Sequence, residues 1–325
     1  LQLDAVLVDA KDFGLNFNFN ISYNRGKIDK LNGSSFWQSS SWAGTAAAGI
    51  EDFLVEEGGR LGEVYGYKTD GFYTADDFTF DAEKGTYALK AGVNDCSSLI
   101  GGKVYPGSIK LKANEDGEYK KERLGNTVPT VSGGFGLNAR WKGFDFTAFF
   151  NYSLGNKIVN ATKLGSSFYS GSSKNWNIND HFTSTNRYSW IDPSTGTNLL
   201  SSASIKANGE AWTINRLNEV NTGSSIWNPA AATVMPLVDW AVEDGSFLRV
   251  NNITIGYTLP KLLVSKLNIQ NIRIYVTGYN LHCFTKYSGT DPEVDCCTST
   301  PMTPGIDYAA YPKSRSFVGG INVTF

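Results

Sequence analysis

The residues that could take part in catalysis are few and scattered along the chain. Only two histidines occur, His181 and His282, and the residues around them suggest no nucleophile–base–carboxylate arrangement. The carboxylate pairs Glu56-Glu57 and Asp76-Asp77 could act as acid and base in a glycosidase, but their spacing in sequence does not fix their separation in space. Solvated loop side chains are the simpler interpretation, so we predict that the protein is not an enzyme and has no catalytic residue.

Three of the four cysteines lie close together near the C-terminal end. Cys283, Cys296 and Cys297, with His282, could be imagined as zinc ligands, but no C-x₂-C spacing is present. In an oxidising compartment a disulfide from Cys283 to Cys296 or Cys297 is the favoured interpretation, and unpaired cysteines are the alternative. We therefore expect no metal and no cofactor.

Tryptophan is the residue type that most clearly points to binding. Most of the eight tryptophans lie outside the segments that alternate in polarity. A rigid ring with an N–H donor suits stacking on a sugar or holding a partner protein, but it also suits the core of a large folded loop or an interfacial belt. The candidate substrate-binding rings are Trp37, Trp42, Trp176, Trp190, Trp212 and Trp227.

The composition limits the elements that can position these residues. The 325 residues carry 29 Lys and Arg against 31 Asp and Glu, a formal net charge of −2, which excludes a nucleic-acid binder that relies on a broad basic field. Charged residues make up 18% and aromatic residues 13%, with 34 glycines. No apolar run reaches the roughly 18–20 residues of a transmembrane helix. This combination favours β-structure.

Strict alternation of apolar and polar residues is the main structural signal. From Phe13 to Asn24, large apolar side chains occupy one face of an expected strand and Gly, Asn and Ser the other. The pattern recurs from Val131, from Phe144, from Asn252 and over 317–325, and more weakly over 1–8 and 271–281. About ten residues of such alternation is the length of a tilted strand that crosses a bilayer.

The connections between these segments alternate in length. Those at 9–12, 141–143 and 260–270 are short, whereas those at about 25–129, 156–245 and 282–315 are long and polar. A membrane barrel with short periplasmic turns and long extracellular loops sorts its connections in this way. We expect extra hairpins within 25–129, near Leu61 to Tyr73 and Lys103 to Lys112, and no helical period sustained over two turns anywhere.

Eight short segments are more specific than the alternation. They are Asn18–Asn24, Gly62–Tyr67, Tyr105–Lys110, Lys142–Phe150, Asp244–Pro260, Ile272–Leu281, Thr285–Glu293 and Ile321–Phe325. In this order they resemble the SusC/RagA family of TonB-linked outer-membrane proteins, with gaps over about 30–60, 75–100 and 165–240.

The resemblance implies an all-β, membrane-spanning antiparallel β-barrel of twenty-two strands. Residues 1–325 would form its C-terminal part, with the plug domain and the TonB-contacting segment outside this chain. It further implies the outer membrane of a Gram-negative bacterium, a SusD-like surface lipoprotein as partner, and pairing of two such complexes in a dimer. Phe325 would present a terminal aromatic to the barrel assembly machinery.

The function implied is TonB-dependent import of a nutrient, most readily an oligosaccharide, through the SusC-like channel of a SusCD-type complex. A RagAB-type importer of peptides is one alternative. The other is a soluble, secreted all-β module that binds or hydrolyses carbohydrate through its Trp-rich loops.

Overall fold

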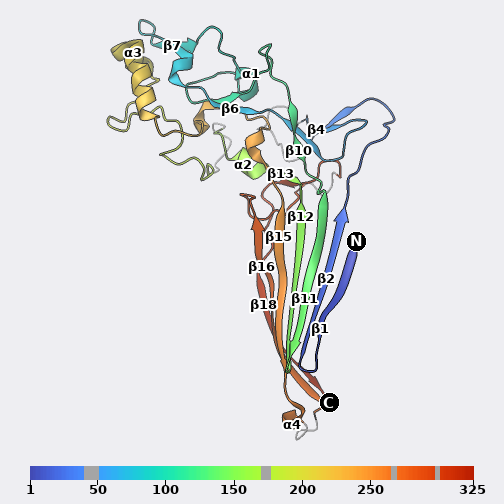
Figure 1. Ribbon diagram of the computed structural model, residues 1–325. Helices are drawn as coiled ribbons and strands as arrows, with labels where there is room; N and C mark the ends of the chain where they lie inside the picture. The colour runs from blue at the N-terminus through green and yellow to red at the C-terminus, as the bar shows by residue number, and fades with distance from the viewer. Residues whose placement is uncertain (40–50, 170–176, 265–268, 297–300) are drawn as a thin grey trace.

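The computed structural model describes residues 1–39, 51–169, 177–264, 269–296 and 301–325 (Figure 1). Its main element is a seven-stranded antiparallel sheet in the order β1-β2-β11-β12-β15-β16-β18. The strands are β1 (Gln2–Asp9), β2 (Phe13–Tyr23), β11 (Val131–Trp141), β12 (Phe144–Leu154), β15 (Phe247–Thr258), β16 (Asn271–Thr285) and β18 (Ser316–Thr324). All the alternating segments, including the two weaker ones, therefore form strands of one sheet, as predicted.

The register of the strands gives the sheet one apolar and one polar face. Leu137 lies opposite Phe17 on one side and Ala148 on the other, and Ile255 lies opposite Phe146. Because partners in register share a face, the apolar rows of all seven strands coincide. The large side chains on this apolar face include Phe13, Phe17, Ile21, Phe146, Phe150, Ile255, Ile321 and Val323.

A two-residue turn sets the register of the central hairpin. Lys142 and Gly143, between β11 and β12, both have positive φ, at 46° and 90°. This is the conformation of a type I′ turn, whose twist matches that of the two strands it joins. The eleven residues of β11 then pair with those of β12 without a shift from Trp141↔Phe144 to Val131↔Leu154.

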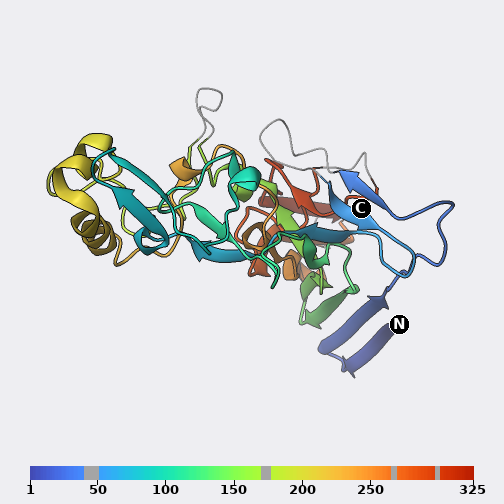
Figure 2. The same cartoon turned by 90° about the horizontal axis from the view of Figure 1, so that it is seen from above.

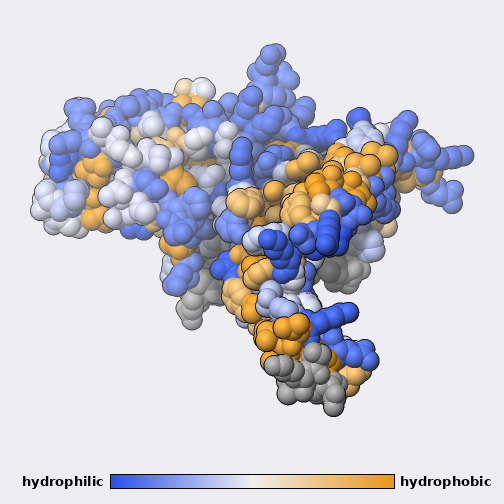
Figure 3. Space-filling model, turned by 60° about the horizontal axis from the view of Figure 1, so that its bottom comes forward, coloured by the Kyte–Doolittle hydropathy of each residue, from blue (hydrophilic) through white to orange (hydrophobic). Residues whose placement is uncertain are grey.

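The short and the long connections lie at opposite ends of the sheet. Figure 1 shows the short connections and α4 (Lys261–Val264) at one end and the long segments at the other. Viewed from above, the strands follow a curve, and the long segments extend to one side (Figure 2). Apolar residues gather over the sheet, whereas the surface of the extended part is mostly hydrophilic (Figure 3).

The long segments fold into an outer lobe with its own hydrophobic core, which includes Phe53, Tyr73, Phe78, Leu217 and Trp227. Its strands are β3 (Phe36–Ser39), β4 (Glu51–Val55), β5 (Glu63–Gly66), β6 (Thr69–Phe72), β7 (Phe78–Asp81), β8 (Thr86–Leu89), β9 (Ile109–Leu111), β10 (Glu122–Asn126), β13 (Lys157–Asn160), β14 (Val242–Asp244) and β17 (Ile306–Asp307). Its helices are η2 (Ala75–Asp77), α1 (Ser97–Ile100), α2 (Ala161–Gly165), α3 (Ser202–Val220), η4 (Pro229–Ala231) and η5 (Asp239–Ala241). Extended structure within 61–73 and 103–112 agrees with the expected hairpins.

No sustained helical period predicts α3, which nevertheless spans 19 residues. It is kinked at Gly209, whose φ of 77° and ψ of 176° break the helical backbone, so the two halves present no common apolar face. Its only buried apolar side chains are Ile205 and Leu217. Polar contacts add to this packing, because Ser201 caps the start of the helix and Arg216 binds Asp192. Hydrophobic periodicity cannot reveal such a helix.

Among the described residues, no helix combines the length and the apolar character that crossing a membrane requires.

The two faces of β2 provide a direct test of the membrane assignment. Replacing Phe17, on the apolar face near the middle of the strand, with Arg should destabilise the folded protein by about 2–4 kcal/mol if that face contacts lipid. Replacing the adjacent Asn18, on the polar face, with Arg should cost much less. Unfolding in detergent or lipid, followed by heat-modifiable gel mobility, measures both. Equal losses for the two variants would contradict the assignment.

Candidate functional site

The polar face of the sheet is lined mainly by neutral hydrogen-bonding groups. The Thr147 hydroxyl donates to Asn138 Oδ1 at 3.1 Å, and the hydroxyls of Thr254 and Thr277 lie 2.8 Å apart. The backbone N–H of Gly134 donates to Asn20 Oδ1 at 3.1 Å. Such a surface can exchange hydrogen bonds with hydroxyl and amide groups of a passing molecule and carries little fixed charge.

Two ion pairs cross this face, each over a glycine. Arg273 on β16 reaches over Gly256 on β15 to Asp145 on β12, and its Nε donates to Asp145 Oδ1 at 2.8 Å. A Cβ at position 256 would lie 2.5 Å from both the Arg273 Nη2 and the Asp145 Oδ1, so a side chain there would displace the ion pair. In the same way, Arg140 passes over Gly14 to reach Asp9 on β1. Each arginine thereby neutralises its carboxylate within the wall.

A buried arginine joins the outer end of the sheet to the segment that follows β16. Arg249, on the polar face of β15, is 3% exposed. Its Nη2 donates to Asp291 Oδ1 at 2.5 Å, and its Nη1 donates to Asn280 Oδ1 at 2.5 Å. Its Nε lies 2.5 Å from Glu293 Oε2, which also pairs with Lys313 Nζ at 2.8 Å. This Arg249 clamp holds residues 291–293 and 313 against the wall.

A polar pocket of about 280 Å³ lies beside the clamp, between the outer lobe and the segment after β16. Its lining includes Lys163, His181 and Asp307, together with hydroxyl and amide side chains from both parts. We call it the outer pocket. It combines donors and acceptors of both charges, which suits a polar ligand with several hydrogen-bonding groups.

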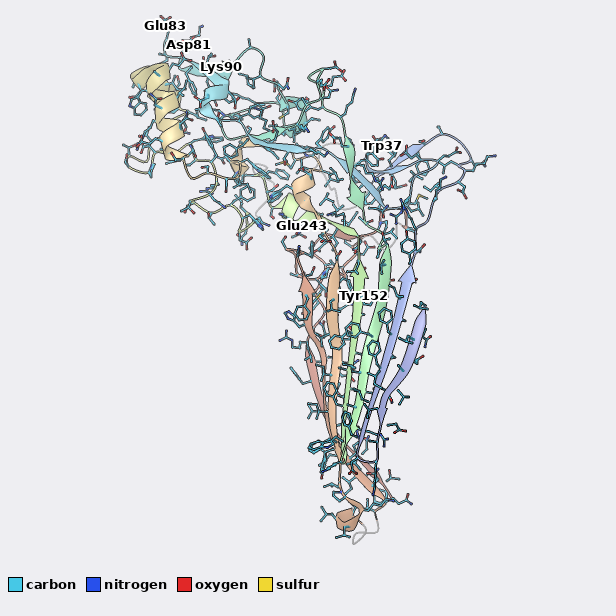
Figure 4. The ribbon with its side chains drawn as sticks, viewed as in Figure 1. Trp37, Asp81, Glu83, Lys90, Tyr152 and Glu243 are labelled. Carbon is cyan, nitrogen blue, oxygen red and sulfur yellow. The ribbon has the colours of Figure 1, made fainter. Side chains whose placement is uncertain are left out.

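Glu243, labelled in Figure 4, binds two of the residues that line the outer pocket, Lys163 and Ser288, from behind the lining. Its carboxylate accepts hydrogen bonds from the Ser288 hydroxyl at 2.7 Å and the Ser288 N–H at 2.8 Å, and it lies 3.1 Å from Lys163 Nζ. Burial alone would raise the pKa of Glu243, but the Ser288 hydrogen bonds and the Lys163 charge outweigh it and hold the pKa below its ordinary value. The Lys163 ammonium also lies 4.0 Å from the centre of the Trp240 ring.

Asp307 has the opposite electrostatic environment on the wall of the same pocket. It is 4% exposed, and it accepts a hydrogen bond from the Tyr287 hydroxyl at 2.6 Å. Burial raises the pKa of Asp307 above its ordinary value despite this hydrogen bond. Asp307, with a raised pKa, therefore lines the pocket, whereas Glu243, with a lowered pKa, lies behind the lining residues Lys163 and Ser288.

The tryptophans fall into two groups. Trp227 is buried and donates its ring N–H to the Ser167 carbonyl at 3.1 Å, and Trp190 donates to the Pro106 carbonyl at 2.6 Å. Both rings therefore pack within the outer lobe. Trp37 and Trp212 are exposed, at 38% and 43%. Trp42 and Trp176 lie outside the described residues.

The other sequence candidates lie apart from one another. Cys283 forms no bridge to Cys296 in the part of the chain that the structure describes. Cys297, the other partner considered, lies outside the described residues. Cys283 lies opposite Arg249 in the β15–β16 register, whereas the Cys296 N–H bonds to the Ile306 carbonyl in the outer lobe. Phe325 is 80% exposed beyond the end of β18.

The histidines and carboxylate pairs show no catalytic grouping. The His181 ring lies edge-on to Trp240, and His282 lies edge-on to Phe284. Glu57 accepts the Leu31 N–H and Asp77 accepts the Thr74 N–H, so one carboxylate of each pair stabilises a loop. Among the described residues, no three His, Cys, Asp or Glu side chains gather as metal ligands would.

The residues that sequence reasoning missed are those of the clamp and the outer pocket. Arg249, Asp291 and Glu293 fall inside two of the segments that carry the family resemblance, 244–260 and 285–293. The resemblance of these two segments to the family was the only indication that the three residues matter. No local sequence pattern indicated that they would meet across the sheet. Lys163 and Glu243 lie outside the segments that carry the resemblance.

The fold defines a class of protein: an antiparallel sheet with one apolar face, one polar face and long segments at one end is part of a membrane β-barrel wall. No family model matches the chain. It is 29% identical to TonB-dependent receptor P3 of Formosa agariphila over 324 residues, covering 98% of this chain and 27% of that protein. It is 23% identical to TonB-dependent receptor SusC of Bacteroides thetaiotaomicron over 335 residues, covering 100% of this chain and 26% of SusC.

Solved structures agree in fold. The RagAB peptide importer in its open-open state matches with a TM-score of 0.58 and 21% identity, over 100% of this chain and 28% of the RagAB chain. The closed-closed state matches with a TM-score of 0.59. The chain thus spans about a quarter of the curated relatives it matches. The expected resemblance to SusC/RagA-type TonB-dependent receptors, and the barrel fold it implies, are confirmed.

The Arg249 clamp can be tested by removing its cation. Arg249→Met should leave Asp291 as a buried, unpaired carboxylate, a change that costs about 3–5 kcal/mol. We expect the segment 286–315 to become the first site of cleavage by external protease, with the sheet still folded. The control is Arg140→Met, which removes an exposed ion pair and should cost less than about 1 kcal/mol. Unchanged protease resistance in Arg249→Met would show that the clamp does not hold the segment.

The Glu243 cluster predicts a dependence on acid. Because the folded-state pKa of Glu243 is lowered, its contribution to stability is present above its unfolded pKa and is lost as pH falls below about 5. Glu243→Gln should lower protease resistance of the outer lobe at pH 7 and flatten its decline between pH 5 and pH 3. If Glu243→Gln and the parent protein lose protease resistance over the same pH range, the titrating group is not Glu243.

Proposed function

We propose that this chain forms part of the barrel wall of a TonB-dependent importer in the outer membrane of a Gram-negative bacterium, acting as the SusC-like component of a SusCD-type complex. The observation that carries the proposal is the seven-stranded sheet with coincident apolar rows, together with its match to SusC and RagAB over the whole chain. A non-catalytic role follows, in which the sheet lines the path and the segments at its outer end form the rim.

The proposed partners follow from the same likeness. A SusD-like lipoprotein would cover the outer face, and the TonB complex would act through parts of the protein beyond this chain. The soluble carbohydrate-binding module considered as an alternative fits poorly, because the sheet has an apolar face along its whole length with large side chains exposed, such as Ile255 at 56% and Ile321 at 65%.

We propose an oligosaccharide as the substrate. Amide and hydroxyl groups dominate the polar face, and its ion pairs, such as Asp145 with Arg273, are internally neutralised. A neutral, hydroxyl-rich molecule can exchange hydrogen bonds with such a wall without having to desolvate a charge.

A peptide is the second candidate, favoured by the outer pocket. Lys163, Asp307 and His181 give it groups of both charges, which a zwitterionic ligand could contact. RagAB, which has the same fold, is a peptide importer by description.

Uptake by whole cells tests the proposal. Cells that carry the protein should accumulate labelled neutral oligosaccharides, and uptake should stop when TonB is deleted or a protonophore is added. Labelled peptides of similar mass serve as the matched comparison. Accumulation of peptides alone would replace the oligosaccharide with the peptide candidate, and TonB-independent accumulation of both would argue against an energised importer.

A further inference from the structure

An apolar groove of about 540 Å³ lies at the outer end of the sheet, and the proposed function does not use it. Five of its lining residues belong to the apolar face: Phe135, Tyr152, Leu154, Leu248 and Phe284. They come from four neighbouring strands, β11, β12, β15 and β16. The groove therefore opens on the side of the wall that would contact lipid, away from the transport path.

The height of the groove on the wall can be estimated from the strands. β12 has eleven residues, which extend about 33 Å along the strand and, at a tilt of about 40°, cross about 25 Å. At its beginning, Phe144 stacks with Trp141 and Tyr257, as in an aromatic belt at a membrane boundary. Tyr152 and Leu154, at the end of β12, then lie at the opposite boundary. Figure 4 shows Tyr152 near this end of the sheet.

The outer end of the groove is polar, and one lysine and one carboxylate line it. Lys286, which is exposed, lies in its lining and forms no ion pair within the described part of the chain. Asp244, also in the lining, has a pKa below its ordinary value because it accepts hydrogen bonds from Ser246 and lies near the charges of Lys157 and Lys286. The lining thus holds one ammonium group, that of Lys286, and one carboxylate, that of Asp244, while Lys157 lies outside the lining.

The groove thus has the two parts that a membrane lipid requires. Its apolar length, continuous with the lipid-facing rows, suits an acyl chain, and Lys286 at the boundary suits an anionic headgroup. Asp244, together with the hydroxyls of Ser246 and Thr285 beside it, could accept or donate hydrogen bonds to sugar hydroxyls. A phosphorylated sugar headgroup matches this mixture better than a phosphate alone.

We propose that this groove binds an acyl chain of a phosphorylated glycolipid of the outer leaflet, with Lys286 contacting the phosphate. The proposal rests on the outer-membrane location in the proposed function. It adds a specific lipid site on the outside of the wall, separate from the substrate path.

Native mass spectrometry of the protein, purified from its host and delipidated in detergent, tests the proposal. Bisphosphorylated lipid A is the probe, and zwitterionic phosphatidylethanolamine is the comparison lipid. Lys286→Glu should lower the fraction of protein that retains lipid A by about fivefold or more, and Lys286→Arg should restore it. Phe284→Ala, which removes an exposed wall of the groove, should also weaken retention.

Lys142→Glu is the matched control, because it reverses an exposed lysine at the opposite boundary of the same face. It should leave lipid A retention unchanged, and heat-modifiable mobility should show that all variants are folded. Equal retention in Lys286→Glu and the parent protein, an equal loss in Lys142→Glu, or equal retention of the two lipids would overturn the proposal. Since no transport is measured, this result is independent of the uptake test.

Discussion

Each strand of the main sheet has to satisfy two different surroundings at once, since its side chains alternate between faces while its backbone pairs within the sheet. In β2, Phe17 and Asn18 are neighbours in sequence but belong to opposite faces, and the same holds across all seven strands. A shift of one residue in any strand would exchange its apolar and polar rows. The turn at Lys142 and Gly143 sets the unshifted pairing of β11 with β12. The two faces of the sheet therefore depend on this pairing.

Glycine has a specific part in that wall. Where a long side chain crosses a neighbouring strand, the strand beneath it carries no Cβ, as at Gly14 below Arg140 and Gly256 below Arg273. The arginine can then lie flat against the backbone and reach a carboxylate on the next strand but one. The result is a polar face on which the charges of Arg140 and Arg273 are paired in place, beside neutral groups that can hydrogen bond.

Local pattern explains which parts of this structure could be predicted. Alternation is a property of ten or so adjacent residues, so the strands and their faces follow from the sequence around Phe13 or Phe144. The Arg249 clamp could not be foreseen, because Asp291 is 42 positions away and the contact exists only when β15 and β16 pair. Trp227 and Trp212 illustrate the same limit. Both lie in polar segments, but the outer lobe buries one ring and exposes the other.

The outer lobe is made from three separate stretches of the chain: one before β11, one after β12, and one after β16 that contributes β17 and the buried Ile306. Asp239 accepts the Thr69 N–H, Asp76 accepts the Asn218 amide, and Glu210 accepts the Phe80 N–H, so the first two stretches share one core. The hairpin β11–β12 lies between them in sequence. For a wall inserted in a membrane, both stretches must reach the same side before that core can form. The core is completed only when the third stretch, which brings Ile306, reaches that side as well, and the β11–β12 hairpin then lies beneath the finished lobe.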